Sequence, residues 1–110
     1  MPTFITIGYG DRDGYERTDP AVRQAAHAED AKLRSEGALM GIAGTPVQVR
    51  NTGARGIKIM QGPFMSSALP VAGFAVIEAA SLAEAMHKVS RVPCAVAYGV
   101  VEVWPLDKTD

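Results

Sequence analysis

The sequence predicts an α+β fold of the ferredoxin-like type, with an antiparallel sheet that carries two helices on one face. The first observation is the order of the segments, which reads strand, helix, strands, strand, helix, strand. The second is that the two helical segments lie far enough apart to serve as two crossovers. The third is the length of 110 residues with 47% hydrophobic content, which suits one domain with one core.

The first third of the chain predicts a strand, a loop and a helix. Residues 3–10 (TFITIGYG) alternate and are rich in β-branched and aromatic residues, as in a half-buried strand. The glycines and aspartates of residues 10–19 predict a loop. Asp19 followed by Pro20 predicts a capped helix start, and Gly37 is typical of the residue that closes a helix.

The middle of the chain predicts strands. Residues 38–44 form a short strand pattern that glycine interrupts. Residues 46–51 and 55–60 alternate on either side of the glycine-containing segment 52–54, which predicts a hairpin. Residues 73–79 predict one further strand.

The last third predicts the second helix and the final strand. Ser81 and Glu84 have the spacing of a capping box, so the helix should begin at Ser81. Pro93 should end this helix near residue 91 or 92, and residues 99–104 predict a strand closed by Pro105. We expect four apolar residues of the helix to face inward: Leu82, Ala85, Met86 and Val89.

The predicted sheet has large apolar side chains on both faces. In residues 73–79 and 99–104, apolar groups occupy both alternating positions. Two helices can cover only one face, and the remaining apolar surface exceeds what a monomer usually exposes. The sequence therefore predicts a homodimer in which two sheets meet face to face around a shared cavity.

Composition excludes several classes of function. With 11 basic and 12 acidic side chains the net charge is −1, so no positive field favours nucleic acid. No apolar run reaches the roughly 20 residues of a membrane span, and the first residues lack the features of a secretory signal. The single cysteine, Cys94, and the absence of a zinc-type spacing predict a soluble cytoplasmic protein without metal or cofactor.

Four sequence features occur together along the chain. They are the turn Gln61-Gly62-Pro63-Phe64, the strand start 72–74, the helix start 81–85, and the final strand 101–105 (VEVWP). In their order and spacing they resemble the DGPF-type subgroup of the YCII-related family. The resemblance covers nearly all of residues 1–110 as a single domain, and it implies a dimeric α+β barrel.

The resemblance also implies candidate catalytic residues. In the wider family a histidine on the first helix works with an aspartate, and His27 lies close to that place with Asp11 or Asp30 as its partner. His27 is displaced by about one residue from the position of the family's histidine, which would rotate its side chain by roughly 100° around the helix. Where the subgroup has an aspartate before Gly-Pro-Phe, this chain has Gln61, which lacks carboxylate chemistry.

The expected cavity has several candidate ligand-binding residues and two alternative interpretations. Glu78 and Glu102 lie in otherwise apolar strands and could be acid–base groups, or charges at strand ends. The turn at Gly62 could present Phe64 to a cleft, or Phe64 could pin the loop by being buried. Arginines and aromatic rings would suit an aromatic or carboxylate-bearing ligand. The candidates are Tyr9, Arg12, Arg50, Gln61, Phe64, Ser66, Glu78, Glu102 and Trp104.

The remaining titratable side chains predict structural roles: Cys94 as a buried thiol and His87 as a surface side chain. Two functions stay open. One is a noncatalytic dimeric binding or accessory protein with a small-molecule cavity, which Gln61 and the uncharged loop 65–70 favour. The alternative is a cofactor-independent isomerase, lyase or dehalogenase that acts on a small cyclic or aromatic compound through His27 and an aspartate.

Overall fold

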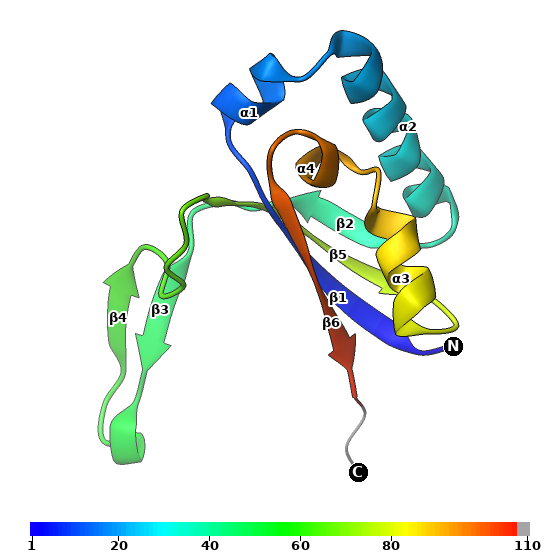
Figure 1. The fold of residues 1–110 in the computed structure, drawn as a ribbon. Helices are drawn as coiled ribbons and strands as arrows, with labels where there is room; N and C mark the ends of the chain where they lie inside the picture. The colour runs from blue at the N-terminus through cyan, green and yellow to red at the C-terminus, as the bar shows by residue number, and fades with distance from the viewer. Residues whose placement is uncertain (108–110) are drawn as a thin grey trace.

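A computed structural model describes residues 1–107, which form a mixed α+β structure around a four-stranded antiparallel sheet (Figure 1). Within these residues, no helix combines the length and apolar character that crossing a membrane requires. In chain order the elements are β1 (Thr3–Tyr9), α1 (Arg12–Arg17), α2 (Pro20–Ser35), β2 (Leu39–Ile42), β3 (Val47–Arg50), the 3-10 turn η1 (Thr52–Ala54), β4 (Lys58–Gln61), β5 (Val71–Glu78), α3 (Leu82–Val89), α4 (Pro93–Val96) and β6 (Val100–Leu106).

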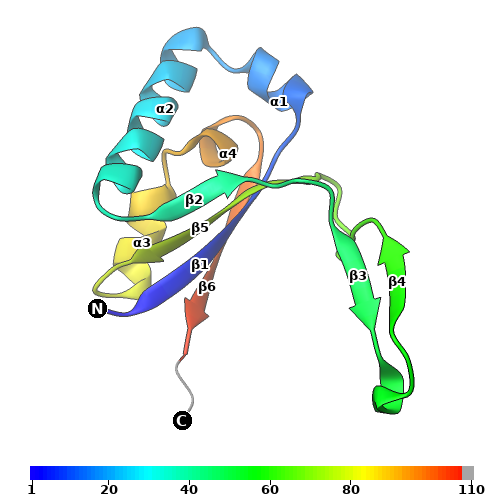
Figure 2. The ribbon, with the colours of Figure 1, turned by 180° about the vertical axis from the view of Figure 1, so that it is seen from behind.

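The main sheet has the strand order β2-β5-β1-β6, and every neighbouring pair is antiparallel. In this register Ile5 of β1 lies opposite Val76 on one side and Trp104 on the other. Helix α2 connects β1 to β2 and helix α3 connects β5 to β6, so each spans a crossover. Figures 1 and 2 show both helices on the same face of the sheet. The predicted α+β class and antiparallel sheet are confirmed.

The core lies between this face and the helices. Phe4 and Ile77 point from the sheet toward Leu33 of α2 and toward Ala85 and Val89 of α3. In α2 only Ala26 and Leu33 are buried, so a narrow stripe of this helix packs on the sheet.

Both predicted helix caps are present. The Asp19 carboxylate accepts a hydrogen bond from the Ala21 N–H at 2.8 Å, with Pro20 in the first helical turn. Ser81 Oγ accepts from the Glu84 N–H at 3.1 Å, and the Glu84 carboxylate accepts from the N–H of Ala80 at 3.1 Å. These bonds satisfy backbone donors that a helix start leaves without partners.

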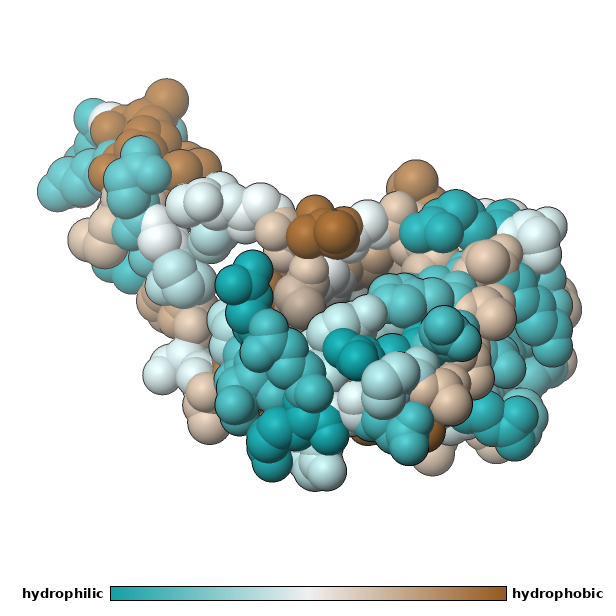
Figure 3. All heavy atoms as spheres, turned by 90° about the horizontal axis from the view of Figure 1, so that it is seen from above, coloured by the Kyte–Doolittle hydropathy of each residue, from teal (hydrophilic) through white to brown (hydrophobic). Residues whose placement is uncertain are grey.

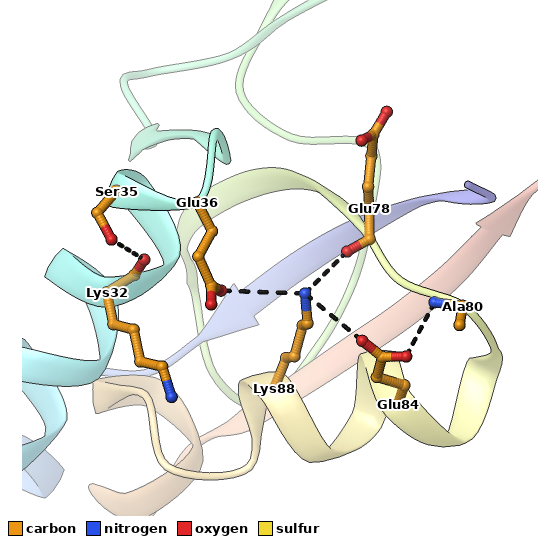
Figure 4. A network of polar contacts seen from close by, with 7 residues as sticks. All are labelled: Lys32, Ser35, Glu36, Glu78, Ala80, Glu84 and Lys88. Carbon is orange, nitrogen blue, oxygen red and sulfur yellow. Dashed lines mark hydrogen bonds and ion pairs between the residues drawn. The ribbon is translucent and has the colours of Figure 1, made fainter.

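Lys88 joins the ends of three elements (Figure 4). Its ammonium group donates to the backbone carbonyl of Glu78 at the end of β5, at 3.1 Å. It also lies 3.7 Å from the Glu84 carboxylate of α3 and 3.9 Å from that of Glu36, at the end of α2. The contact ties both helices to one end of the sheet.

Two short helices were not predicted. Residues 12–17, which we expected to be a loop, form α1 because Asp11 accepts a hydrogen bond from the Gly14 N–H at 2.9 Å and so caps the turn. At Pro93 the chain begins α4. A proline is tolerated in the first turn of a helix, because a backbone N–H there would have no acceptor within the helix.

Two further expectations were wrong in detail. Only Ala85 and Val89 of α3 are buried, whereas Leu82 and Met86 are about half exposed, because the sheet contacts a narrower stripe than the pattern suggests. Strand β6 continues through Pro105, because β6 is an edge strand and its proline needs no further ladder partner.

The predicted hairpin is confirmed, but it forms a separate two-stranded sheet, β3-β4. We call residues 47–61 the arm, because Figures 1 and 2 show them projecting away from the main sheet. The radius of gyration is 16.0 Å, whereas a compact chain of this length has roughly 13 Å. The projecting arm explains the difference.

We expect Ser81→Ala to lower the free energy of unfolding by about 1 kcal/mol, because the Glu84 N–H loses its acceptor at the start of α3. Urea denaturation measures this. Ser90→Ala is the control at the other end of α3, where only an exposed bond to the His87 carbonyl is lost. Equal effects of the two substitutions would contradict the role of the cap.

Candidate functional site

The face of the main sheet that carries no helix is largely apolar and exposed, and we call it the open face. Its side chains alternate with those of the core, so that Ile5, Val76 and Trp104 lie side by side across three strands. Trp104 is 56% exposed and Leu39 is 74% exposed. The large apolar residues of the open face that are more than about one-third exposed are Leu39, Phe74, Val76, Val100, Trp104 and Leu106.

One end of the open face contains a pocket of about 410 Å³ between β1, β6 and the loop 65–69. Glu102 is one of the residues that line it. The Tyr9 hydroxyl donates a hydrogen bond to Glu102 Oε1 at 2.7 Å, and Trp104 Nε1 donates to the same oxygen at 3.4 Å. Met65 Sδ lies 3.3 Å from the Tyr9 hydroxyl. Two aromatic donors therefore hold one carboxylate.

The hydrogen-bonded side chains of Tyr9 and Glu102 determine the electrostatics of this pocket. The pKa of Tyr9 is raised above its ordinary value of 10.0, first by the hydrogen bond to Glu102, then by burial and by the charge of Glu102. Tyr9 therefore stays protonated and acts as a donor at neutral pH. Of the described residues that line the pocket, Glu102 alone carries a charge.

The turn before loop 65–69 shows why glycine is needed at position 62. Gly62 has a φ of +95°, a backbone conformation that residues other than glycine rarely adopt. The Phe64 ring is 77% exposed, with the Arg50 guanidinium carbon 5.7 Å from its centroid. The interpretation that Phe64 pins the loop by burial is therefore wrong within this chain.

A second pocket, of about 360 Å³, lies between α2, α4 and the helix-facing side of the sheet. Four titratable side chains line it: His27, Asp30, Arg34 and Cys94. Burial raises the pKa of Asp30, and the charges of His27 and Arg34 oppose this effect. Burial also raises the pKa of Cys94, and the Asp30 charge adds to it. The thiol is therefore disfavoured as a nucleophile at neutral pH.

His27 lies at the exposed rim of this second pocket and has a partner that the sequence did not suggest. Its Nε2 is 2.7 Å from the hydroxyl of Tyr15, and the two ring centroids are 5.8 Å apart. Asp30 lines the same pocket, whereas Asp11 caps α1. Tyr15 was missed because residues 12–17 were expected to be a loop.

The structure brings together some predicted site residues and separates others. Tyr9, Ser66, Glu102 and Trp104 share the open-face pocket, and Met65 and Leu69 of the same loop were missed. The loop follows the Gly-Pro-Phe turn, which is the signal that could have indicated them. Other candidates lie outside this pocket: Arg12 begins α1, Arg50, Gln61 and Phe64 lie on or beside the arm, and Glu78 ends β5. His87 is exposed, as expected.

Glu78 shares the open face with Glu102 but not its surroundings. Figure 4 shows the Glu78 carboxylate pointing away from Lys88, which binds only its backbone carbonyl. Within residues 1–107, no group of three or more His, Cys, Asp or Glu side chains is placed to hold a metal ion. No protein-family model matches the chain, and a comparison with curated proteins finds no match.

We expect Glu102→Gln to lower the pKa of Tyr9 toward its ordinary value, because the carboxylate acceptor and its charge are both removed. An ultraviolet absorbance titration of the tyrosines measures this, and Tyr9→Phe identifies the transition of Tyr9. Glu78→Gln is the matched control and should leave that transition in place. An unchanged Tyr9 transition in Glu102→Gln would show that the pair does not form.

Proposed function

We propose that the protein is a homodimer whose two open faces meet around a chamber, and that the pocket at Glu102 binds a small molecule there without catalysis. The observation that carries this proposal is the open face itself. Its exposed apolar side chains lie on β2, β5 and β6, and the partly buried Ile5 of β1 lies between those of β5 and β6. A patch of this kind is costly in water and is typical of an interaction surface.

Size supports a second copy of the chain as the cover. A stable interface needs roughly 800 Å² from each partner, and in the proposed dimer the open face and the arm would contribute to it together. Two identical faces related by a two-fold axis also match in shape and character. The strand order β2-β5-β1-β6 with two crossovers supports the ferredoxin-like topology and, with it, a relation to the DGPF-type YCII proteins.

The arm supplies a second surface for the same partner. Figure 3 shows hydrophobic side chains gathered on it, and Val47, Val49, Ile57 and Ile59 are each more than half exposed. The arm has three basic and no acidic side chains, so in a chain of net charge −1 the remainder carries −4. We propose that each arm lies against the body of the partner, where apolar contact and opposite charge act together.

Two features support binding rather than chemistry at the Glu102 pocket. The loop 65–69 contributes no titratable side chain. Glu102 already accepts a hydrogen bond from Tyr9 at 2.7 Å, which holds it as an oriented acceptor.

A second candidate function is proton-transfer catalysis in the pocket under α2. The observation that favours it is that His27 and Asp30 line one pocket, with Tyr15 holding the histidine ring. Histidine is a common general acid and base in proton transfer at neutral pH. The substrate would then be a small cyclic or aromatic compound, as the sequence suggested.

We expect Val76→Asp to convert the dimer to monomer, because it places a charge in the centre of the open face. Analytical ultracentrifugation at micromolar concentration measures the mass. Val22→Asp is the matched control, since Val22 is a similarly exposed valine that lies in α2 and not on the open face. Val49→Asp in the arm should weaken the dimer. A monomeric wild-type protein would overturn the proposal.

We expect His27→Ala to leave ligand-induced shifts of Tm unchanged, because His27 lies in the other pocket. A thermal-shift screen of small cyclic and aromatic compounds on both proteins measures this, with His87→Ala as the surface control. If His27→Ala instead abolishes the shift while the Tm without ligand stays the same, the catalytic alternative is favoured.

A further inference from the structure

The charge pattern of the Glu102 pocket bears on the kind of ligand that it accepts. Its lining includes one carboxylate and no basic side chain, and the loop 65–69 is neutral. Among residues 1–107, no lysine or arginine forms an ion pair with Glu102. The pocket therefore presents a single negative charge in apolar and aromatic surroundings.

The carboxylate is also incompletely used. Both Tyr9 and Trp104 donate to Oε1, and no described residue donates to Oε2. The second oxygen can accept one or more charge-assisted hydrogen bonds from a ligand. The rings of Tyr9 and Trp104 stand beside the same carboxylate, and electron-rich aromatic faces attract organic cations.

Burial in the proposed dimer would make a positively charged ligand beside Glu102 more favourable. When a second copy covers the open face, Glu102 loses much of its contact with water, and a buried carboxylate without a cation is costly. The hydrogen bonds from Tyr9 and Trp104 offset part of this cost but add no positive charge. A cationic ligand would supply the missing charge.

We infer that the pocket formed by Tyr9, Glu102, Trp104 and the loop 65–69 binds a small organic cation, an amine with an apolar body. The inference rests on the proposed ligand-binding function and names its ligand class. It departs from the carboxylate-bearing ligand that the arginines suggested, because Arg12 lies in α1 and Arg50 lies over Phe64. A carboxylate in the pocket would meet the like charge of Glu102.

The fluorescence of Trp104, the only tryptophan of the chain, reports directly on this pocket. We would titrate the full-length protein with 2-phenylethylamine, 2-phenylethanol and phenylacetate, which share a ring and differ in charge. We expect the amine to bind about tenfold more tightly than the alcohol, and phenylacetate to bind most weakly.

Two variants separate the role of Glu102 from that of the open face. Glu102→Gln keeps the size of the side chain and removes its charge, so the amine should lose about tenfold in affinity and its preference over the alcohol. Glu78→Gln removes a carboxylate from the same face outside the pocket and should change neither value. Ultracentrifugation of each variant checks that the dimer is intact.

The outcomes distinguish this inference from the proposed function. If the alcohol or phenylacetate binds as tightly as the amine, or if Glu102→Gln has no effect, the cation is excluded while ligand binding stands. If the protein is a dimer and none of the three probes binds, the inference fails and the dimer stands. If the protein is a monomer and no probe binds, the proposed function fails as well.

Discussion

The structure depends on an imbalance between a sheet that is apolar on two faces and a helical layer that covers one of them. On the covered face Phe4 and Ile77 of the sheet and Leu33 of α2 form the core between the layers. On the open face the same alternation of the strands places valines, a phenylalanine and a tryptophan in contact with water. Helices therefore cover one apolar face of the sheet and leave the other apolar face exposed.

The same imbalance explains why polar groups on the open face are informative. A carboxylate in an apolar surface is costly to cover unless it is paired, so its position has to be compensated. Glu102 is compensated by two aromatic donors, whereas Glu78 lies at the strand end with its carboxylate directed away from the nearest lysine. Two glutamates in similar sequence contexts thus have different environments, and only one lies in a pocket.

Much of the fold could be predicted from local patterns, because alternation, capping residues and turn glycines act over a few residues. The caps at Asp19 and Ser81 and the hairpin around Gly53 are examples. The helix at 12–17 could not, because it depends on one hydrogen bond from Gly14 to Asp11 in a segment whose composition is typical of a loop. The separation of the arm from the main sheet could not be predicted either. The hairpin pattern predicts that the two strands of the arm pair with each other, but not where the arm packs.

The candidate site was predictable only in part, because pockets join residues that are distant in sequence. Tyr9, Glu102 and Trp104 could be named because they are unusual residues in strands, whereas Met65 approaches Tyr9 across 56 positions, and the nearby Gly-Pro-Phe turn does not show which strand the loop meets. The arm has a further consequence. A hairpin of two short strands is only marginally stable by itself in water, and the described chain gives β3 and β4 no other sheet to pair with. In the proposed dimer, ordering of the arm and its docking on the partner would be one coupled event, and the last step of folding would then depend on protein concentration.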